Sequence, residues 1–272
     1  MVSETDWDLV WRHERLHRRH EPVDFRRWKR ASQRALRELF PGDGVRLLDA
    51  TAGLGDHTVN LAELGFRTEA CDASAEARDA TTEALRAAGL EGRVPVWGAR
   101  WETLGSTHAA RFDLIFHDAI HWIEREDDMH RALVGLRDAL APGGALVFFF
   151  ADPEAPEEGA GLRILEWDRS GIAPATLAWD HPTDDGGRVT HLRVAAPAEQ
   201  HIDEQLLYVV RDARGAARLE STTMRRIYRW DWHAMTRALA SAGYGEVIGR
   251  RFVNDKGHPF AMSLAHRPGS RR

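Results

Sequence analysis

The sequence predicts an α/β fold, with a largely parallel sheet covered by helices on both faces and an antiparallel insertion after the fifth strand. Short apolar segments alternate with helical patterns up to residue 152, which is typical of parallel strands joined by helices. These strands are apolar on both sides, so both faces of the sheet are expected to be covered. From residue 176 the pattern changes to period-two alternation split by short turns, which indicates antiparallel strands.

The first strand–loop–helix unit lies at residues 45–58, with the sequence VRLLDATAGLGDHT. An apolar run ends in Asp49, a loop with Gly53 and Gly55 follows, and a helix then begins in polar residues. Such a loop presents backbone N–H groups to a ligand, and glycine lets the backbone approach closely or adopt a positive φ. The G-x-G-x-x-G dinucleotide fingerprint does not fit, because Thr58 occupies the third glycine position. The carboxylate before the loop suits a cationic ligand end better than a pyrophosphate.

A second unit of the same kind follows. Residues 66–71 form a short expected strand that ends at Asp72, 23 residues after Asp49. This spacing is close to the roughly 20 residues at which an acidic side chain accepts hydrogen bonds from a ribose diol. Since parallel strands end at one edge of the sheet, the two carboxylates are expected to lie near each other.

The remaining elements continue this order along the chain. The expected elements are a helical region over 7–40, a helix over 75–88, strands over 94–97 and 112–116, a helix over 127–140, a strand over 145–150, an acidic linker over 153–161, strands over 176–179, 188–194, 205–210 and 222–230, a helix over 232–242, and a hairpin of 246–253 with 259–265. We therefore divide the chain into a core of 1–152, an insertion of 153–230, and a segment of 231–272 that completes the core.

Composition limits the classes of function. The chain has 272 residues and a net charge of −5, which argues against binding along a nucleic-acid backbone. No apolar run approaches the roughly 20 residues that span a bilayer, and the N-terminus has no apolar signal region, so we expect no membrane partner and a cytoplasmic protein. The single cysteine, Cys71, excludes an internal disulfide, and no tight metal-ligand spacing occurs, so no metal is expected. The sequence leaves homo-oligomerisation open.

The pattern D-x-x-x-G-x-G from Asp49 to Gly55 resembles motif I of the class I S-adenosylmethionine-dependent methyltransferases, with Thr51 in place of the family's first glycine. The L-x-P-G-G turn over 140–144 is also similar to that family. The resemblance covers residues 47–150 and 232–265, and it implies a Rossmann-like sheet of seven strands. An antiparallel insertion at this place is similar to the glycine N-methyltransferases and the amino-sugar N-methyltransferases.

The resemblance implies S-adenosylmethionine as cofactor and suggests its contacts. Asp49 would orient the ammonium of the amino-acid tail, and Asp72 would hold the ribose diol. The loop glycines would let the backbone pack against the tail and the ribose. The segment 99–104 resembles the family's A-N-W-x-T-L, so Trp101 inherits a role in stacking on the adenine, with ordinary core packing as the alternative. Arg100 departs from the family's Asn or Asp, and Trp11 is spaced like a family tryptophan near the cofactor. The implied cofactor-binding residues are Trp11, Asp49, Thr51, Gly53, Gly55, Asp72, Ala73, Arg100, Trp101 and His117.

Three residues after the fourth strand are candidates for catalysis. A substrate amine is nucleophilic only when neutral, so a histidine that takes its proton would help near neutral pH. His121 and His117 are the candidate bases, and Asp118 is a candidate contact to the cofactor or the base. A structural histidine with satisfied hydrogen bonds is the alternative for either ring.

Aromatic residues of the insertion are expected to line or cover an acceptor pocket, where they favour positive charge through cation–π attraction. Arg225 is the candidate for binding an anionic group of the acceptor. The alternatives are a dimer contact, the core of the insertion, and a solvated strand face. The candidate substrate-binding residues are Arg225, Tyr208, Tyr228 and Trp230.

The ordered motifs predict an S-adenosylmethionine-dependent methyltransferase, and the resemblance of the insertion implies transfer to a nitrogen of a small-molecule acceptor. Ala151 stands where the glycine N-methyltransferases carry the arginine that binds the glycine carboxylate, so glycine is not the expected acceptor. An O- or C-methyltransferase is one alternative, and a non-catalytic protein that binds the cofactor is another.

Overall fold

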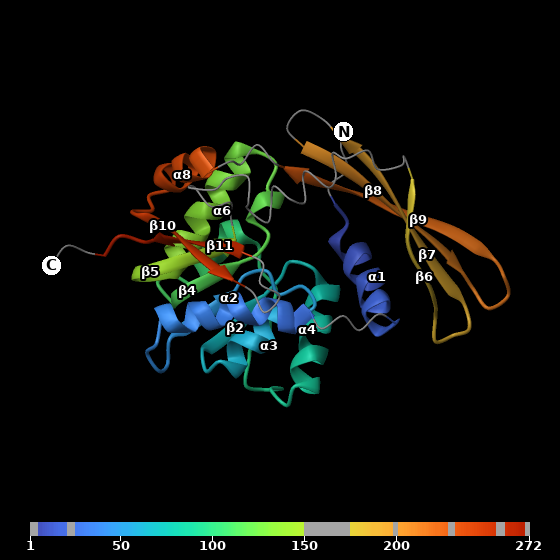
Figure 1. Cartoon of the computed structure of the whole chain (residues 1–272), viewed down its shortest axis with the longest axis horizontal. Coiled ribbons are helices and arrows are strands. Elements are labelled where there is room, and N and C mark those ends of the chain that lie inside the picture. Colours follow the sequence, from blue (N-terminus) through green and yellow to red (C-terminus); the bar gives the residue numbers. More distant parts are fainter. Residues whose placement is uncertain are drawn as a thin grey trace. The chain divides into compact units, whose positions relative to one another are not determined.

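The computed structural model describes residues 5–20, 25–149, 175–197, 201–227, 232–253 and 259–269 (Figure 1). The chain divides into two compact units. One comprises Met1–Val23 and Ile164–Arg229, and the other comprises Asp24–Arg163 and Trp230–Arg272.

The larger unit is built on a seven-stranded sheet with the strand order β10-β11-β5-β4-β1-β2-β3 (Figure 1). Its central strands pair in parallel, and β11 pairs antiparallel with both β5 and β10. The strands are β1 (Arg46–Asp49), β2 (Arg67–Cys71), β3 (Val96–Trp97), β4 (Phe112–His117), β5 (Leu140–Phe149), β10 (Val247–Val253) and β11 (Pro259–His266). The predicted α/β fold with seven strands is confirmed. β5 begins five residues before the predicted strand, because Leu140 already pairs with Phe112 before an irregularity in the register.

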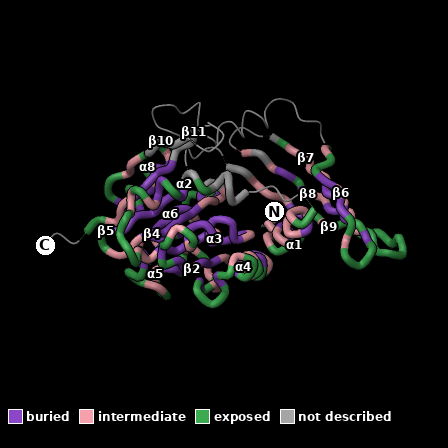
Figure 2. The backbone as a smooth tube through the Cα atoms, turned by 60° about the horizontal axis from the view of Figure 1, so that its bottom comes forward, coloured by how far each residue is buried: buried purple, intermediate pink, exposed green. Residues whose placement is uncertain are grey.

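Helices cover both faces of this sheet. Alternate strand residues Leu47, Leu114 and Val147 pack in one cluster with side chains of α2 and α3, while Leu48 and Ile115, which point to the opposite face, are also fully buried. Buried residues are concentrated in this central region in Figure 2. The helices are α2 (Phe25–Leu39), α3 (Asp56–Glu63), α4 (Ala75–Ala87), α5 (Leu104–Thr107), α6 (Glu126–Ala139) and α8 (Trp232–Ser241), with short 3-10 turns at Trp101–Thr103 and Ile120–Trp122.

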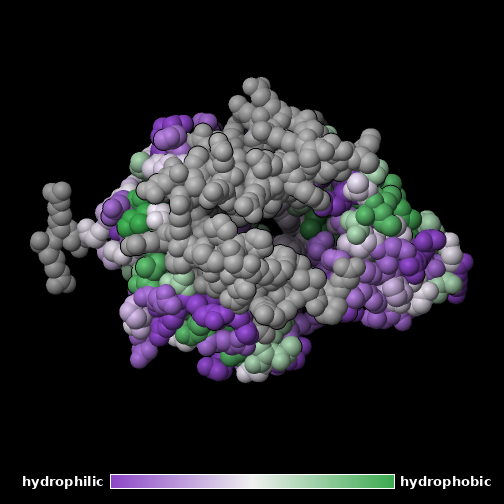
Figure 3. Space-filling view, in the orientation of Figure 1, coloured by the Kyte–Doolittle hydropathy of each residue, from purple (hydrophilic) through white to green (hydrophobic). Residues whose placement is uncertain are grey.

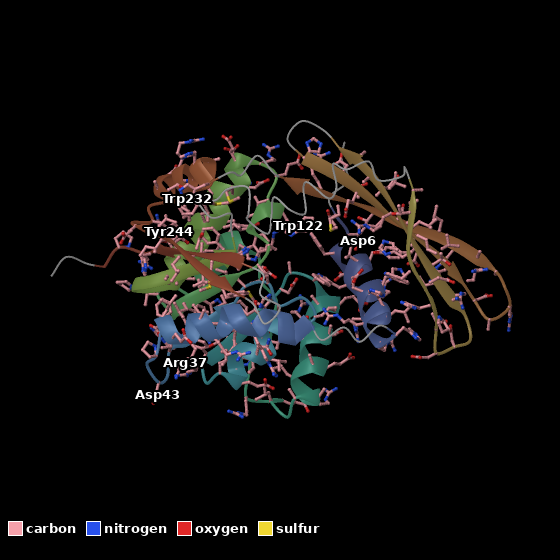
Figure 4. The ribbon with its side chains drawn as sticks, viewed as in Figure 1. Asp6, Arg37, Asp43, Trp122, Trp232 and Tyr244 are labelled. Carbon is pink, nitrogen blue, oxygen red and sulfur yellow. The ribbon has the colours of Figure 1, made fainter. Side chains whose placement is uncertain are left out.

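The helix α8 and the chain that follows it are fixed onto α6. The hydroxyl of Tyr244, labelled in Figure 4, donates a hydrogen bond to the Leu133 carbonyl of α6 at 3.1 Å. Tyr244 and Leu133 are both buried, so this bond satisfies two polar groups inside the unit. The C-terminal segment is therefore part of the larger unit.

The smaller unit contains an antiparallel sheet in the order β6-β7-β8-β9 and the helix α1 (Trp7–His20). Its strands are β6 (Thr176–Pro182), β7 (Arg188–Pro197), β8 (His201–Arg211) and β9 (Ala217–Ile227). They confirm the antiparallel insertion after the fifth strand. In the view of Figure 3, mostly hydrophilic side chains cover this unit.

The position of α1 differs from the division made on the sequence, which grouped residues 1–152 in one core. Leu9 and Leu16 of α1 pack instead in one apolar cluster with Trp179, Leu206 and Tyr208 of the antiparallel sheet. The apolar stripe of an amphipathic helix needs a complementary apolar face, and the insertion supplies it. The N-terminal helix is thus part of the smaller unit.

Among the described residues, none of the helices combines the length and the apolar character that a membrane crossing requires.

Candidate functional site

Asp49 lies at the carboxyl end of β1 and orders the loop that follows. Its side chain is fully buried, with one oxygen accepting from the Thr51 N–H at 3.2 Å and the other from the Thr58 hydroxyl at 2.7 Å. Thr58 belongs to the first turn of α3. The carboxylate therefore joins the strand, the loop and the helix, and its influence on a ligand passes through the loop backbone.

The two loop glycines do different things. Gly53 has a φ of +53° and donates its N–H to an Asp72 oxygen at 3.1 Å. Gly55 has a φ of +85°, and an added Cβ would lie 2.9 Å from the Ala84 Cβ and 3.0 Å from the Thr81 Cα of α4. Gly53 thus shapes the side of the loop that meets Asp72, whereas Gly55 permits close packing on α4 rather than approach to a ligand.

Asp72 follows β2 and is the second carboxylate at this edge. Its oxygens accept from the Ser74 N–H at 2.9 Å and the Gly53 N–H at 3.1 Å. Burial raises the pKa of Asp72, while these two hydrogen bonds act in the opposite direction. A carboxylate accepts about four hydrogen bonds, so the side chain can receive two hydroxyl groups in addition. Ala73 beside it is exposed.

Trp101 borders the end of β1. Its indole N–H donates to the Ala50 carbonyl at 2.8 Å, and its ring lies 4.4 Å from the ring of His117 with an angle of 56° between the planes. Arg100 is exposed and pairs with Glu102 at 2.8 Å. The structure thus places the indole of Trp101 at the same sheet edge as Asp49, with the neighbouring Arg100 engaged with a carboxylate.

His117, at the end of β4, has a geometry that counts against the predicted role as a base. The ring is fully buried, and its Nδ1 accepts from the Ala119 N–H at 3.2 Å. Because Nδ1 serves as an acceptor, the neutral ring carries its proton on Nε2, which makes that nitrogen a donor. The side chain of His121, the other candidate base, lies outside the described residues.

Asp118 is the third carboxylate, placed just after β4. Its N–H donates to the Thr51 hydroxyl at 3.0 Å, which ties the loop after β4 to the loop after β1. Its Oδ2 lies 2.9 Å from His57 Nε2, and His57 Nδ1 lies 2.6 Å from Gln33 Nε2. His57 and Gln33 are not among the candidate site residues predicted from the sequence. The position of His57 in the first helical turn after the glycine loop is the one sequence feature that could have indicated a site residue. No sequence pattern points to Gln33.

The remaining candidates belong to the smaller unit. Tyr208 is fully buried and stacks on His13 with ring centroids 4.0 Å apart, which makes it a core residue of that unit rather than an exposed wall. Arg225 pairs with Asp203 on the neighbouring strand at 2.5 Å, and Trp11 lies in α1. The candidates Tyr228 and Trp230 fall outside the described residues.

Residues 47–144, which contain all three carboxylates, match the family of methyltransferase domains. The chain carries a methyltransferase domain. The match includes the glycine loop, Trp101 and the loop after β4. Together with the fold, it confirms the predicted class I S-adenosylmethionine-dependent methyltransferase architecture.

Solved structures of methyltransferases share the fold over almost the whole chain. The sugar N-methyltransferase KedS8 from Streptoalloteichus sp ATCC 53650 is 20% identical, with a TM-score of 0.65 over 98% of this chain and 95% of that one. CalS10, an amino pentose methyltransferase from Micromonospora echinaspora solved with S-adenosylmethionine bound, is 18% identical, with a TM-score of 0.57 over 98% of each chain. At these identities the likeness shows the fold of the methyltransferase domain and its insertion.

A curated relative matches part of the sequence. The tRNA 5-carboxymethoxyuridine methyltransferase of Escherichia coli (strain K12) is 31% identical over 118 residues, which is 43% of this chain and 44% of that protein. The aligned region thus spans less than half the length of this relative.

Proposed function

We propose that this methyltransferase domain transfers a methyl group from S-adenosylmethionine to an amine nitrogen of a small-molecule acceptor. The observation that carries the proposal is the set of three aspartates at the ends of β1, β2 and β4 that hydrogen-bond to the loop after β1. Asp49 orders the loop, the Asp72 carboxylate accepts from the Gly53 N–H, and the backbone N–H of Asp118 donates to the Thr51 hydroxyl. This edge is where open α/β sheets bind ligands.

The residues of this edge fit the parts of S-adenosylmethionine. Asp72 accepts hydrogen bonds from the two ribose hydroxyls, since each of its oxygens holds one backbone N–H and has room for a second donor. Gly53 and Thr51 supply the loop beside the amino-acid tail, and Asp49 keeps that loop in place. We assign Trp101 and the exposed Ala73 to the adenine. The cofactor supplies a methyl group on a positively charged sulfur.

Asp118 is assigned to the acceptor side. During methyl transfer the attacking nitrogen changes from neutral to positively charged, so a fixed carboxylate next to it stabilises the transition state more than the ground state. About a third of the Asp118 side chain is exposed (36%), which leaves it accessible to a ligand. The nitrogen then releases a proton, for which His121 is retained as the proposed base. His117 is not proposed as a base, because its Nδ1 already accepts a hydrogen bond.

The choice of a small amine is supported by the insertion. KedS8 and CalS10, named for a sugar N-methyltransferase and an amino pentose methyltransferase, share the fold with this chain over 98% of its length, insertion included. Asp118 then provides the group that receives an amine. The proposed acceptor class is a small amine, and a turnover assay with different amines identifies the skeleton that carries it.

The proposal is tested by turnover with S-adenosylmethionine labelled with ¹³C in its methyl group. The purified chain is incubated with separate pools of amino sugars, nucleotide-linked amino sugars, simple alkylamines, phenols and carboxylic acids. We expect a labelled product in an amine pool, with an NMR shift typical of a methyl group on nitrogen. A product formed only on oxygen or carbon contradicts the nitrogen assignment, and cofactor binding without any turnover favours a non-catalytic binding protein.

A second candidate function is methylation of tRNA. It is favoured by the 31% identity to a tRNA methyltransferase over 118 residues. The net charge of −5 opposes extended contact with a phosphate backbone. A pool of tRNA from a strain lacking the corresponding modification is added to the same assay. Labelled tRNA with no labelled small amine would replace the small-molecule proposal.

A further inference from the structure

Gln33, His57 and Asp118 form a hydrogen-bonded row that leads from the interior of the larger unit to its candidate site. Gln33 in α2 is fully buried, and only 5% of the His57 side chain is exposed, whereas Asp118 is the accessible end at 36%. The contacts are 2.6 Å between Gln33 Nε2 and His57 Nδ1, and 2.9 Å between His57 Nε2 and Asp118 Oδ2. Three elements of the unit thus converge on one carboxylate.

The direction of these hydrogen bonds follows from the chemistry of the groups. An amide NH₂ is only a donor, so Gln33 donates to Nδ1 of His57. The ring proton then lies on Nε2, and His57 donates it to the carboxylate of Asp118. The ring is also held by Phe116, with centroids 4.6 Å apart and planes at 45°. His57 therefore has a fixed ring orientation and a fixed tautomer.

Asp118 is held from a second side as well. Its backbone N–H donates to Thr51 Oγ1, which belongs to the loop after β1. The backbone bond fixes the start of the side chain, and the His57 bond fixes its end. A hydrogen bond from a buried donor limits the rotation of a carboxylate.

We propose that Gln33 and His57 are positioning residues that hold the Asp118 carboxylate in a fixed orientation against the amine of the acceptor. This inference rests on the proposed function and adds to it the means by which the acceptor amine is recognised. Gln33 and His57 act only through Asp118 and do not touch the acceptor. A carboxylate in a fixed place also discriminates a cationic or hydrogen-donating acceptor group from an anionic one.

Sinefungin is a suitable probe, because it carries an ammonium group where S-adenosylmethionine carries its methyl group. A carboxylate that receives the acceptor amine attracts this ammonium, whereas S-adenosylhomocysteine has no group at that place. The ratio of the two dissociation constants, measured by calorimetry, therefore reports on Asp118 and is independent of the acceptor. S-adenosylhomocysteine serves in each variant as the internal control for an intact fold and cofactor site.

We expect Asp118→Asn to weaken sinefungin about tenfold or more, the usual effect of losing a charge-assisted hydrogen bond, with S-adenosylhomocysteine affinity changed by less than about twofold. His57→Phe keeps a ring but lacks the donor, so we expect about a threefold loss confined to sinefungin. His57→Gln places an amide NH₂ near the position of Nε2 and should restore the wild-type ratio. Asp127→Asn, which removes an exposed carboxylate from the first turn of α6, is the matched control with no expected change.

A spectroscopic measurement tests the role of Gln33. Long-range ¹H–¹⁵N spectra of histidine-labelled protein, with His57 identified by its loss in His57→Phe, should show the Nε2–H tautomer. We expect Gln33→Leu to produce a mixture of tautomers and a reduced preference for sinefungin. A Nδ1–H tautomer in the wild-type protein would overturn the proposed row.

The outcomes separate the two proposals. If S-adenosylhomocysteine and sinefungin both bind and their ratio is unchanged in Asp118→Asn and His57→Phe, the positioning role is wrong while the proposed function stands. If the wild-type protein binds neither, the proposed function fails and the inference falls with it.

Discussion

The substitution Asp72→Ala tests the assignment of the ribose carboxylate. In the structure Asp72 accepts two backbone N–H groups, at 2.9 and 3.1 Å, and it has capacity for the two hydroxyls of a ribose. Hydrogen bonds to a charged group contribute about 1.5–3 kcal/mol, and a wider interval of roughly 1–3 kcal/mol covers partial replacement by water. We therefore expect the dissociation constant of S-adenosylhomocysteine to rise between about fivefold and 150-fold.

Calorimetric titration of S-adenosylhomocysteine measures this change directly. Asp79→Ala is the matched control, because it removes an exposed carboxylate from α4 without touching the loop. Thermal unfolding of both variants distinguishes loss of the ligand contact from loss of the loop, since Asp72→Ala also leaves the N–H groups of Gly53 and Ser74 without that acceptor. An affinity equal to that of the wild type in a stable Asp72→Ala variant would refute the assignment.

The same residue gives the binding a pH dependence. Burial raises the pKa of Asp72 above its ordinary value of 3.8, so its carboxylate becomes protonated at a higher pH than an ordinary aspartate. A neutral carboxyl group is a poorer acceptor for the ribose hydroxyls. We expect S-adenosylhomocysteine affinity to fall as the pH is lowered toward this raised pKa, and the fall should be absent in Asp72→Ala.

Four further substitutions test the packing of the glycine loop, the adenine contact and the pH dependence of the smaller unit. Gly55→Ala puts a Cβ 2.9 Å from the nearest α4 side chain at a φ of +85°, so we expect the unfolding free energy to fall by about 2–4 kcal/mol. Gly65→Ala is the control: its φ is +88°, but the added Cβ has nothing within 4 Å, so we expect a fall of only about 1 kcal/mol. Trp101→Phe removes the 2.8 Å hydrogen bond that holds the indole at the Ala50 carbonyl, and we expect the binding free energy of the cofactor to weaken by about 1 kcal/mol. An unchanged dissociation constant in calorimetry would contradict a contact between the indole and the cofactor. Burial lowers the pKa of His191 from 6.5 to about 3, so folding favours its neutral form. The free energy of unfolding of the smaller unit should therefore fall as the pH drops from about 6.5 toward 3, by an amount on the order of several kcal/mol. Acid titration of wild type and His191→Phe by near-UV circular dichroism checks this, and equal pH profiles would contradict it.

The sheet and its carboxylates could be predicted because each depends on local sequence. Asp49 and Asp72 both follow apolar runs, and parallel strands bring such ends to one edge. The tryptophan of the 99–104 segment was found by resemblance, and the structure places it beside the end of β1. These features need only the order of strands and helices.

The contacts of Gln33 and His57 could not be predicted, because they depend on how α2 packs on α3. The two residues are 24 positions apart, and the 2.6 Å contact between them exists only after the helices meet. The same limit applies to α1. Its apolar stripe packs on the antiparallel sheet, but an amphipathic pattern does not indicate which surface the helix packs against. The tautomer of His117 was likewise set by a backbone N–H two residues later.

The central claim is that the carboxylate edge of the larger unit binds S-adenosylmethionine. Calorimetric titration of the purified chain with S-adenosylmethionine and S-adenosylhomocysteine, with NADH as the control dinucleotide, tests it most directly. We expect both adenosyl ligands to bind with micromolar dissociation constants and NADH not to bind. Binding of NADH, or of neither adenosyl ligand, would contradict the claim and remove the basis for the roles assigned to Asp49, Asp72 and Asp118.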